Sequence, residues 1–121
     1  MPKIMLAEDD HTMVTLLETL LGMEGYQVVA LSVNEDIFEA IRGDFPDLLL
    51  MDVHLPHSNG LDVLDQLRAN DETCDLKVVM SSGLDLDLEC RNHGADDFLM
   101  KPYMPDDLLN ILKRHLNHSQ L

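Results

Sequence analysis

Short apolar segments alternate along the chain with longer segments whose apolar residues recur every three or four positions. Consecutive apolar and β-branched residues predict strands, and helical spacing predicts the helices between them. The expected strands cover residues 3–7, 27–31, 47–51, 77–80 and 98–100. Within 47–51, four consecutive residues are apolar, which is typical of a strand buried on both faces of a sheet.

The helices are expected in the segments between the strands and after the last one. The first has helical spacing from Met13 to Leu21, and Gly25 follows it as a residue that tolerates the left-handed conformation. Asn34 is expected to cap a short second helix that closes at Gly43. The remaining helices are expected to begin near Leu61, to cover residues 86–92 and to begin at Pro105.

Strands that alternate with helices predict the α/β class, with a doubly wound five-stranded parallel sheet and five helices on its two faces. No internal repeat, low-complexity tract or linker interrupts the pattern. We therefore expect residues 1–121 to form a single domain, a length that suffices for one hydrophobic core.

Composition narrows the classes of function. Hydrophobic residues make up 45% of the chain, and no apolar run approaches the length of a membrane span. Because the N-terminus also lacks a basic segment followed by a long apolar one, we expect a cytoplasmic protein without membrane contact. Eight basic residues against 23 acidic ones give a net charge of −15, which repels nucleic acid from this domain. Cys74 and Cys90 form no CxxC pair and are expected to be reduced thiols.

Polar residues of particular types follow the predicted strands. Glu8 and Asp9 follow the first, Asp52 the third, Ser82 the fourth and Lys101 the fifth. In an open parallel sheet, sites form beyond the carboxyl ends of the strands. We therefore expect these five side chains to meet at one edge of the sheet.

The residues after the first strand argue against a flavin or nucleotide site. Such a site needs Gly, Ser or Thr there so that backbone amides face a phosphate, whereas this chain has Glu8, Asp9 and Asp10. The chain also contains neither GxxxxGK[ST] nor GxGxxG. Clustered carboxylates are instead the ligands of a hard divalent cation, and Mg²⁺ typically takes one or two of them together with water and phosphate oxygens.

Lys101 and Ser82 extend this expectation from a metal site to a phosphoryl-transfer site. A cation alone requires neither an ammonium nor a hydroxyl, but both suit a carboxylate that becomes an acyl phosphate. In that transfer negative charge spreads over three oxygens, which Mg²⁺, Lys101 and Ser82 would neutralise. Asp52 is then the expected nucleophile.

Four ordered motifs carry a resemblance to a known family. KIMLAEDD, LLLMDVHLPHSNGLDVL, VVMSSG and GADDFLMKPY resemble the corresponding segments of receiver domains of two-component response regulators, and the resemblance covers essentially the whole chain. It implies a flavodoxin-like fold with strand order 2-1-3-4-5. It also implies a chemotaxis-regulator-like protein that is phosphorylated on an aspartate.

The resemblance implies roles around the metal. Asp52 would be the phosphorylation site, and Asp9 and Asp52 would bind Mg²⁺ directly. Glu8 would act through water, and the backbone carbonyl of His54 would complete the ligands from the protein. Because no further Cys or His lies at usable spacing from His54 and His57, zinc is not expected. The His54 side chain is instead expected to tune hydrolysis of the phosphoryl group.

The resemblance also implies a switch. Ser82 would move toward the phosphoryl group, Lys101 would form an ion pair with it, and the Lys101–Pro102 bond would be cis. Phe98 lies at the position of the switch aromatic, with a plain core phenylalanine as the alternative.

The sequence departs from the family pattern near the face that usually signals, which the fourth helix, fifth strand and fifth helix form. The 18 residues between Ser82 and Lys101 are about one helical turn fewer than is common in the family, so the fourth helix is expected to be short. Gly83 stands where a small Ala is frequent. Ile111 stands where one dimerising subgroup carries Arg.

The expected function is a signalling switch that takes a phosphoryl group from a sensor histidine kinase or a histidine phosphotransfer protein. Output would pass to a downstream protein by direct contact, or to an output domain if the chain is part of a longer protein. No turnover of a free substrate is expected, so the protein would not be an enzyme in that sense. The alternative is a receiver-like binding module that no longer signals by phosphorylation. An aspartyl phosphatase is disfavoured because His54 stands where such enzymes carry a second aspartate.

Overall fold

The chain alternates strands with helices from its first strand to its last helix. The structure, a computed structural model, describes residues 1–32 and 34–116, so the last five residues of the predicted domain lie outside the described part. The elements in chain order are β1 (Lys3–Ala7), α1 (His11–Met23), β2 (Gln27–Ala30), α2 (Ile37–Gly43), β3 (Leu48–Asp52), α3 (Gly60–Arg68), β4 (Lys77–Ser82), α4 (Asp87–Asn92), β5 (Asp97–Met100) and α5 (Pro105–Leu116).

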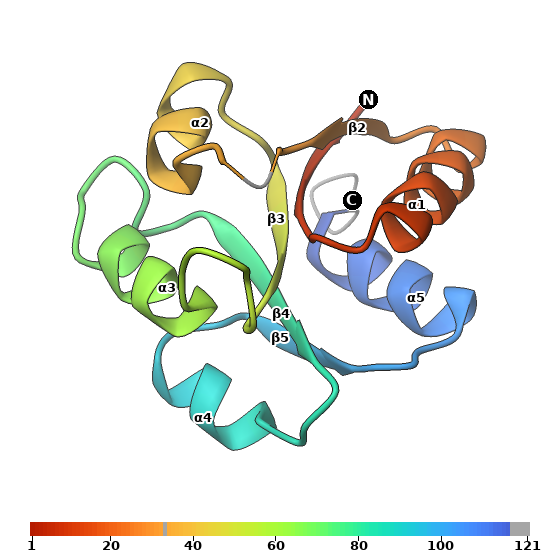
Figure 1. The fold of residues 1–121 in the computed structure, drawn as a ribbon. Coiled ribbons are helices and arrows are strands. Elements are labelled where there is room, and N and C mark those ends of the chain that lie inside the picture. The colour runs from red at the N-terminus through yellow and green to blue at the C-terminus, as the bar shows by residue number, and fades with distance from the viewer. Residues whose placement is uncertain (33, 117–121) are drawn as a thin grey trace.

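The five strands form one parallel sheet in the order β2-β1-β3-β4-β5, which confirms the predicted fold class and strand order. All five residues of the central strand β3 are buried, as its uninterrupted apolar sequence predicts. Figure 1 shows α1 and α5 on one face of the sheet and α2, α3 and α4 on the other.

Each face of the sheet has its own hydrophobic core. On one face, Leu17 and Leu21 of α1 pack with Leu108 and Leu112 of α5 against apolar side chains of the sheet. On the other, α2 and α3 contribute several fully or nearly fully buried residues, whereas α4 contributes only Cys90. The fourth helix is therefore the one least held by apolar burial.

Two helix starts differ from the prediction. Helix α1 begins two residues before Met13 because the Asp10 side chain accepts hydrogen bonds from the backbone N–H groups of Thr12 and Met13, at 3.0 and 3.2 Å. The prediction that Asn34 caps α2 is wrong. Asp36 is the cap, and its carboxylate accepts a hydrogen bond from the Glu39 N–H at 3.1 Å. Gly25 has a φ of 89°, as expected for the residue that ends the first helix.

Strand register brings the predicted site residues to one edge of the sheet. Asp52 pairs with Ser81, so Ser82 extends one residue beyond it, and Ser82 in turn pairs with Met100. Gly60 closes the loop after β3, where its N–H donates to the Val53 carbonyl at 2.7 Å. A Cβ atom at Gly60 would lie 2.5 Å from the Asp52 carbonyl oxygen, so this close approach of two backbones requires glycine.

Gly60→Ala should therefore destabilise the fold. Because the clash is with backbone that cannot easily shift, we expect the free energy of unfolding to fall by about 1–3 kcal/mol. Gly22→Ala is the matched control, because its Cβ meets nothing within 4 Å and alanine favours a helix. Urea unfolding of both variants is the measurement. Equal midpoints for the two variants would contradict the close approach at Gly60.

A hydrogen bond between α3 and the end of α4 is sensitive to pH. His93 Nδ1 lies 2.7 Å from Asp65 Oδ1, and this bond, together with nearby carboxylates, raises the pKa of His93 above its usual value of 6.5 despite partial desolvation. Since the folded-state pKa is the higher one, the stability that His93 contributes is present below the unfolded pKa. It is lost as pH rises through the folded pKa.

His93→Gln should accordingly lower the unfolding midpoint more at pH 6 than at pH 8.5. The comparison is by urea unfolding at both pH values, with His57→Gln as the control because the His57 ring makes no hydrogen bond with the described residues. If His93→Gln lowered the unfolding midpoint equally at both pH values, the charge of His93 would contribute nothing to stability.

Candidate functional site

Lys101 lies between two carboxylates at the edge of the sheet where the strands end. Its Nζ is 2.5 Å from Glu8 Oε1 and 2.7 Å from Asp52 Oδ2, although Glu8 and Lys101 are 93 positions apart in the sequence. The Glu8 and Asp52 side chains are only 7% and 9% exposed. Burial lowers the pKa of Lys101, but its hydrogen bonds and ion pairs with Asp52 and Glu8 together raise it above its ordinary value, so the ammonium stays charged.

Three carboxylates meet in this site. Glu8, Asp9 and Asp52 each offer an oxygen, and these atoms lie within 4.8 Å of one another. Asp52 Oδ1 also accepts a hydrogen bond from the His54 N–H at 3.0 Å, and Glu8 Oε2 accepts one from the Asp10 N–H at 3.1 Å. The exposed Asp9 carboxylate accepts no hydrogen bond from the described residues, so its oxygens are available to a ligand.

This set of donors fits a hard divalent cation. All the donors are oxygens, and among the described residues Lys101 is the cation that contacts them, which leaves part of their negative charge unbalanced. Mg²⁺ prefers such carboxylate oxygens, with water completing its coordination. Asp10 does not belong to the group, because its side chain caps α1 instead.

Ser82 lies beside Lys101 but its hydroxyl is engaged elsewhere. The residue is fully buried, and its carbonyl accepts a hydrogen bond from the Lys101 N–H at 2.8 Å. Its Oγ accepts a hydrogen bond from the Leu84 N–H at 3.0 Å, within the segment that leads into α4. Any movement of the hydroxyl toward Asp52 would therefore break this hydrogen bond.

The other residues that the sequence singled out lie around this centre. The Lys101–Pro102 bond is cis, as predicted. Phe98 is partly buried and packs against the core on the α2–α3–α4 face, a position that leaves both interpretations of its role open. The His54 side chain is exposed, and its effect on phosphoryl hydrolysis stays a prediction.

Tyr103 is a residue of the site region that the sequence interpretation did not single out. Burial raises the pKa of Tyr103 to about 12; the charge of Lys101 opposes this rise, and the charges of Glu8 and Asp52 add to it. Its phenol is therefore neutral at physiological pH and adds no charge to the site. In the sequence, its position directly after Lys101-Pro102 was the feature that could have indicated its proximity to the site.

The family is identified by comparison with known proteins. The family model of the response regulator receiver domain matches residues 4–113, and the chain belongs to this family. The transcriptional regulatory protein CpxR of Klebsiella pneumoniae is 37% identical over an alignment of 123 positions, which covers 98% of this chain and 51% of CpxR. The chain thus spans about half the length of such relatives.

Solved receiver domains have the same fold. The BeF3-activated receiver domain of Klebsiella pneumoniae RstA has a TM-score of 0.86 and 30% identity, covering 96% of this chain and 99% of that one. The receiver domain of the sensor histidine kinase PA1611 from Pseudomonas aeruginosa has a TM-score of 0.80 and 29% identity, covering 96% and 98%. That structure has a magnesium ion coordinated in its active-site cleft.

In the part of this chain that is described, no helix is long and apolar enough to cross a membrane.

Mg²⁺ should stabilise this protein through Asp9. At a concentration about ten times its dissociation constant, the ion should raise the free energy of unfolding by about 1.4 kcal/mol. Asp9→Asn should remove most of that gain, because it deletes the carboxylate that is free to bind. Without the metal, the same substitution should reduce the repulsion among the three clustered carboxylates.

Asp10→Asn is the matched control, since asparagine caps helices as well as aspartate does and the carboxylate removed lies outside the cluster. Thermal unfolding with and without Mg²⁺ measures the difference. If both variants kept the full increase in Tm, Mg²⁺ would be acting by general charge screening rather than at this site.

Proposed function

We propose that Asp52 is the phosphoryl acceptor of this receiver domain, and that the donor is a phosphohistidine on a sensor histidine kinase or a histidine phosphotransfer protein. The observation that carries the proposal is the position of Lys101, whose ammonium bridges Asp52 and Glu8 beside the free carboxylate of Asp9. A carboxylate with a fixed ammonium and a cation-binding group beside it is suited to become an acyl phosphate.

In the proposed transfer a carboxylate oxygen of Asp52 attacks the phosphorus of the phosphohistidine. The O–P bond forms as the N–P bond breaks. The electron pair of the N–P bond stays on the imidazole nitrogen of the donor, which then takes a proton from solvent. The His54 N–H, 3.0 Å from Asp52 Oδ1, orients the acceptor carboxylate. Lys101 exchanges part of its contact with Asp52 for a contact with one phosphoryl oxygen. The Ser82 hydroxyl gives up the hydrogen bond that it accepts from the Leu84 N–H and donates a hydrogen bond to a second phosphoryl oxygen.

Mg²⁺ is the proposed cofactor, which would neutralise developing charge on the transferred phosphoryl group. Asp9 and Asp52 would bind it directly, the His54 carbonyl would supply a further oxygen, and Glu8 would act through water. Glu8 suits the indirect role because both of its oxygens already accept hydrogen bonds. The magnesium ion in the Pseudomonas aeruginosa receiver domain supports this assignment.

The wider role follows from this chemistry. Residues 1–121 would act as one receiver domain in the cytoplasm, catalysing only its own phosphorylation and dephosphorylation. Its output would be a change in protein–protein contact, either with a separate downstream protein or with a fused output region, with Ser82 and Phe98 as the switch residues. The net charge of −15 disfavours contact between this domain and nucleic acid.

Intact-mass spectrometry after incubation with acetyl phosphate tests the acceptor. We expect one phosphoryl adduct that requires Mg²⁺, is absent from Asp52→Asn, and persists in Asp10→Asn. Asp52→Asn removes the nucleophile while keeping nearly the same shape, and Asp10→Asn removes a neighbouring carboxylate that serves only as a helix cap.

Two other results would contradict the proposal. An adduct on Asp52→Asn would assign the acceptor to a different residue. Absence of an adduct from acetyl phosphate and from a phosphorylated histidine kinase, together with absence of Mg²⁺ binding, would favour the alternative of a binding module that does not signal by phosphorylation.

A further inference from the structure

Asp97, the first residue of β5, lies at the centre of the most extensive group of ionic contacts outside the phosphoryl site. Its side chain is only 6% exposed, and each of its oxygens has two partners. Oδ1 accepts from Arg91 Nη2 at 2.8 Å and from the Phe98 N–H at 3.0 Å. Oδ2 lies 2.8 Å from Arg114 Nη1 and 3.0 Å from His115 Nε2.

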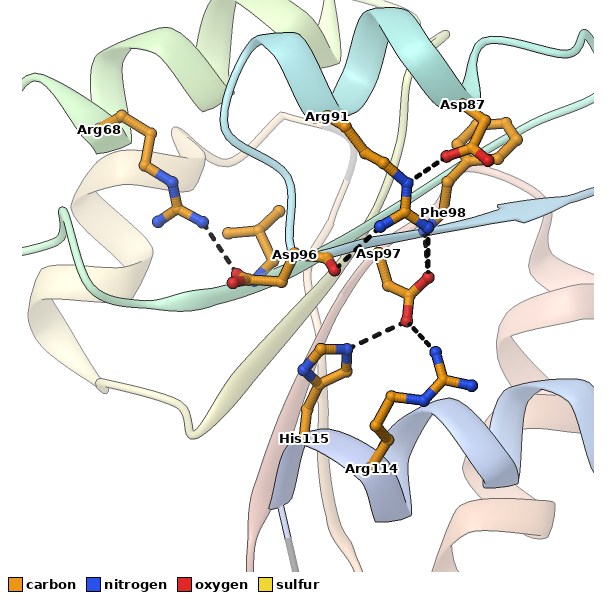
Figure 2. Close-up of polar contacts among 9 residues, drawn as sticks. Arg68, Asp87, Arg91, Asp96, Asp97, Phe98, Arg114 and His115 are labelled. Atoms are coloured by element: carbon orange, nitrogen blue, oxygen red, sulfur yellow. Dashed lines mark hydrogen bonds and ion pairs between the residues drawn. The ribbon is translucent and has the colours of Figure 1, made fainter. Parts of the chain in front are cut away.

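The partners of Asp97 come from opposite faces of the sheet. Figure 2 shows Arg91 reaching it from α4, and Arg114 and His115 reaching it from α5, with β5 between the two helices. Burial raises the pKa of Asp97, but its hydrogen bonds with His115, the Phe98 N–H and Arg91 together lower it below the usual value. The carboxylate therefore remains ionised and joins both helices to the end strand of the sheet.

Helix α4 depends on such polar contacts more than the other helices do. It has six residues and buries only Cys90, and its N-cap residue, Leu86, makes no side-chain capping hydrogen bond. Leu84 and Leu88 remain 60% and 74% exposed. Arg91 therefore supplies much of its attachment, through Asp97 at 2.8 Å and the Asp96 carbonyl at 3.5 Å. Its pair with Asp87 at 2.5 Å lies within the helix.

A continuous path leads from the phosphoryl site to this contact. The Ser82 hydroxyl accepts a hydrogen bond from the Leu84 N–H, and Leu84 lies three residues before α4. When the hydroxyl turns toward a phosphoryl oxygen, that bond breaks and the segment into α4 loses one of its attachments. The Arg91–Asp97 pair then remains, with the His93–Asp65 hydrogen bond and buried Cys90, among the contacts that oppose movement of the helix.

We propose that the Arg91–Asp97 pair is an ionic latch that holds α4 in the arrangement of the unphosphorylated protein and thereby lowers the rate of phosphorylation of Asp52. The regulatory half of this inference rests on the proposed function of Asp52. By linkage, whatever stabilises one arrangement of α4 disfavours the other by the same factor. Arg91 and Asp97 are positioning residues, since neither touches the phosphoryl group.

Arg91→Gln tests the latch, and Arg42→Gln is its matched control. Both arginine side chains are 45% exposed and each contacts two carboxylates, but Arg42 lies on α2, with Glu39 and Glu72 as its partners. Neither substitution removes a buried group, so both variants should fold. Differences between them then report the latch rather than the loss of a surface charge.

The first measurement is hydrogen exchange of unphosphorylated protein, followed by mass spectrometry. Amides of residues 84–93 should exchange about two- to fivefold faster in Arg91→Gln, the range expected for loss of one partly exposed ion pair, and should be unchanged in Arg42→Gln. Unchanged exchange of this segment in Arg91→Gln would overturn the latch.

The second measurement is the rate of adduct formation with acetyl phosphate and Mg²⁺. Arg91→Gln should react about two- to fivefold faster than the unsubstituted protein and Arg42→Gln at the same rate. Faster exchange without faster phosphorylation would overturn the regulatory role. If no protein in the series were phosphorylated by acetyl phosphate or by a phosphorylated histidine kinase, and none bound Mg²⁺, the proposed function of Asp52 would fail, whereas the exchange measurement would still decide whether the latch exists.

Discussion

The two ion pairs of Lys101 hold together strand ends that carry like charges. A parallel sheet places the carboxyl ends of its strands at one edge, and here β1 and β3 deliver Glu8, Asp9 and Asp52 to that edge. Lys101 directly follows β5, which lies two strands away from β3, and its nearly buried partners strengthen the attraction. Any group that competes for this ammonium, such as a phosphoryl oxygen, therefore changes the balance of charge across three strands at once.

The sequence predicted the sheet and the site because both depend on strand ends. Runs such as Leu48–Met51 identify buried strands, and the residues after each run mark the edge where they meet. The cap of α2 could not be predicted in the same way, since Asn34 and Asp36 have similar capping preferences and lie two residues apart. The sequence did not single out Asp97, because its partners on α5 lie 17 and 18 positions further along the chain.

The structure divides the molecule into a firmly packed part and a part held by polar contacts. The central strand is fully buried, and Gly60 fixes the backbone of Asp52 at a separation that admits no side chain. The Asp52 carboxylate therefore has a rigid base. Helix α4 is attached differently, through one buried cysteine, the His93–Asp65 hydrogen bond and Arg91. We therefore expect α4, which lies beside the site, to move more readily than the backbone that carries Asp52.

The contacts of Asp97 also bear on association between molecules. Strand β5 is an edge of the sheet, and an edge strand can pair with a strand of another chain and so begin aggregation. Here the edge is four residues long, begins with a buried charged group, is flanked by two arginines and is followed by Lys101 and Pro102. A strand added to this edge would have to displace these charges and would meet a proline that cannot donate a hydrogen bond. The same carboxylate that joins two helices thus disfavours pairing of β5 with a strand of another molecule.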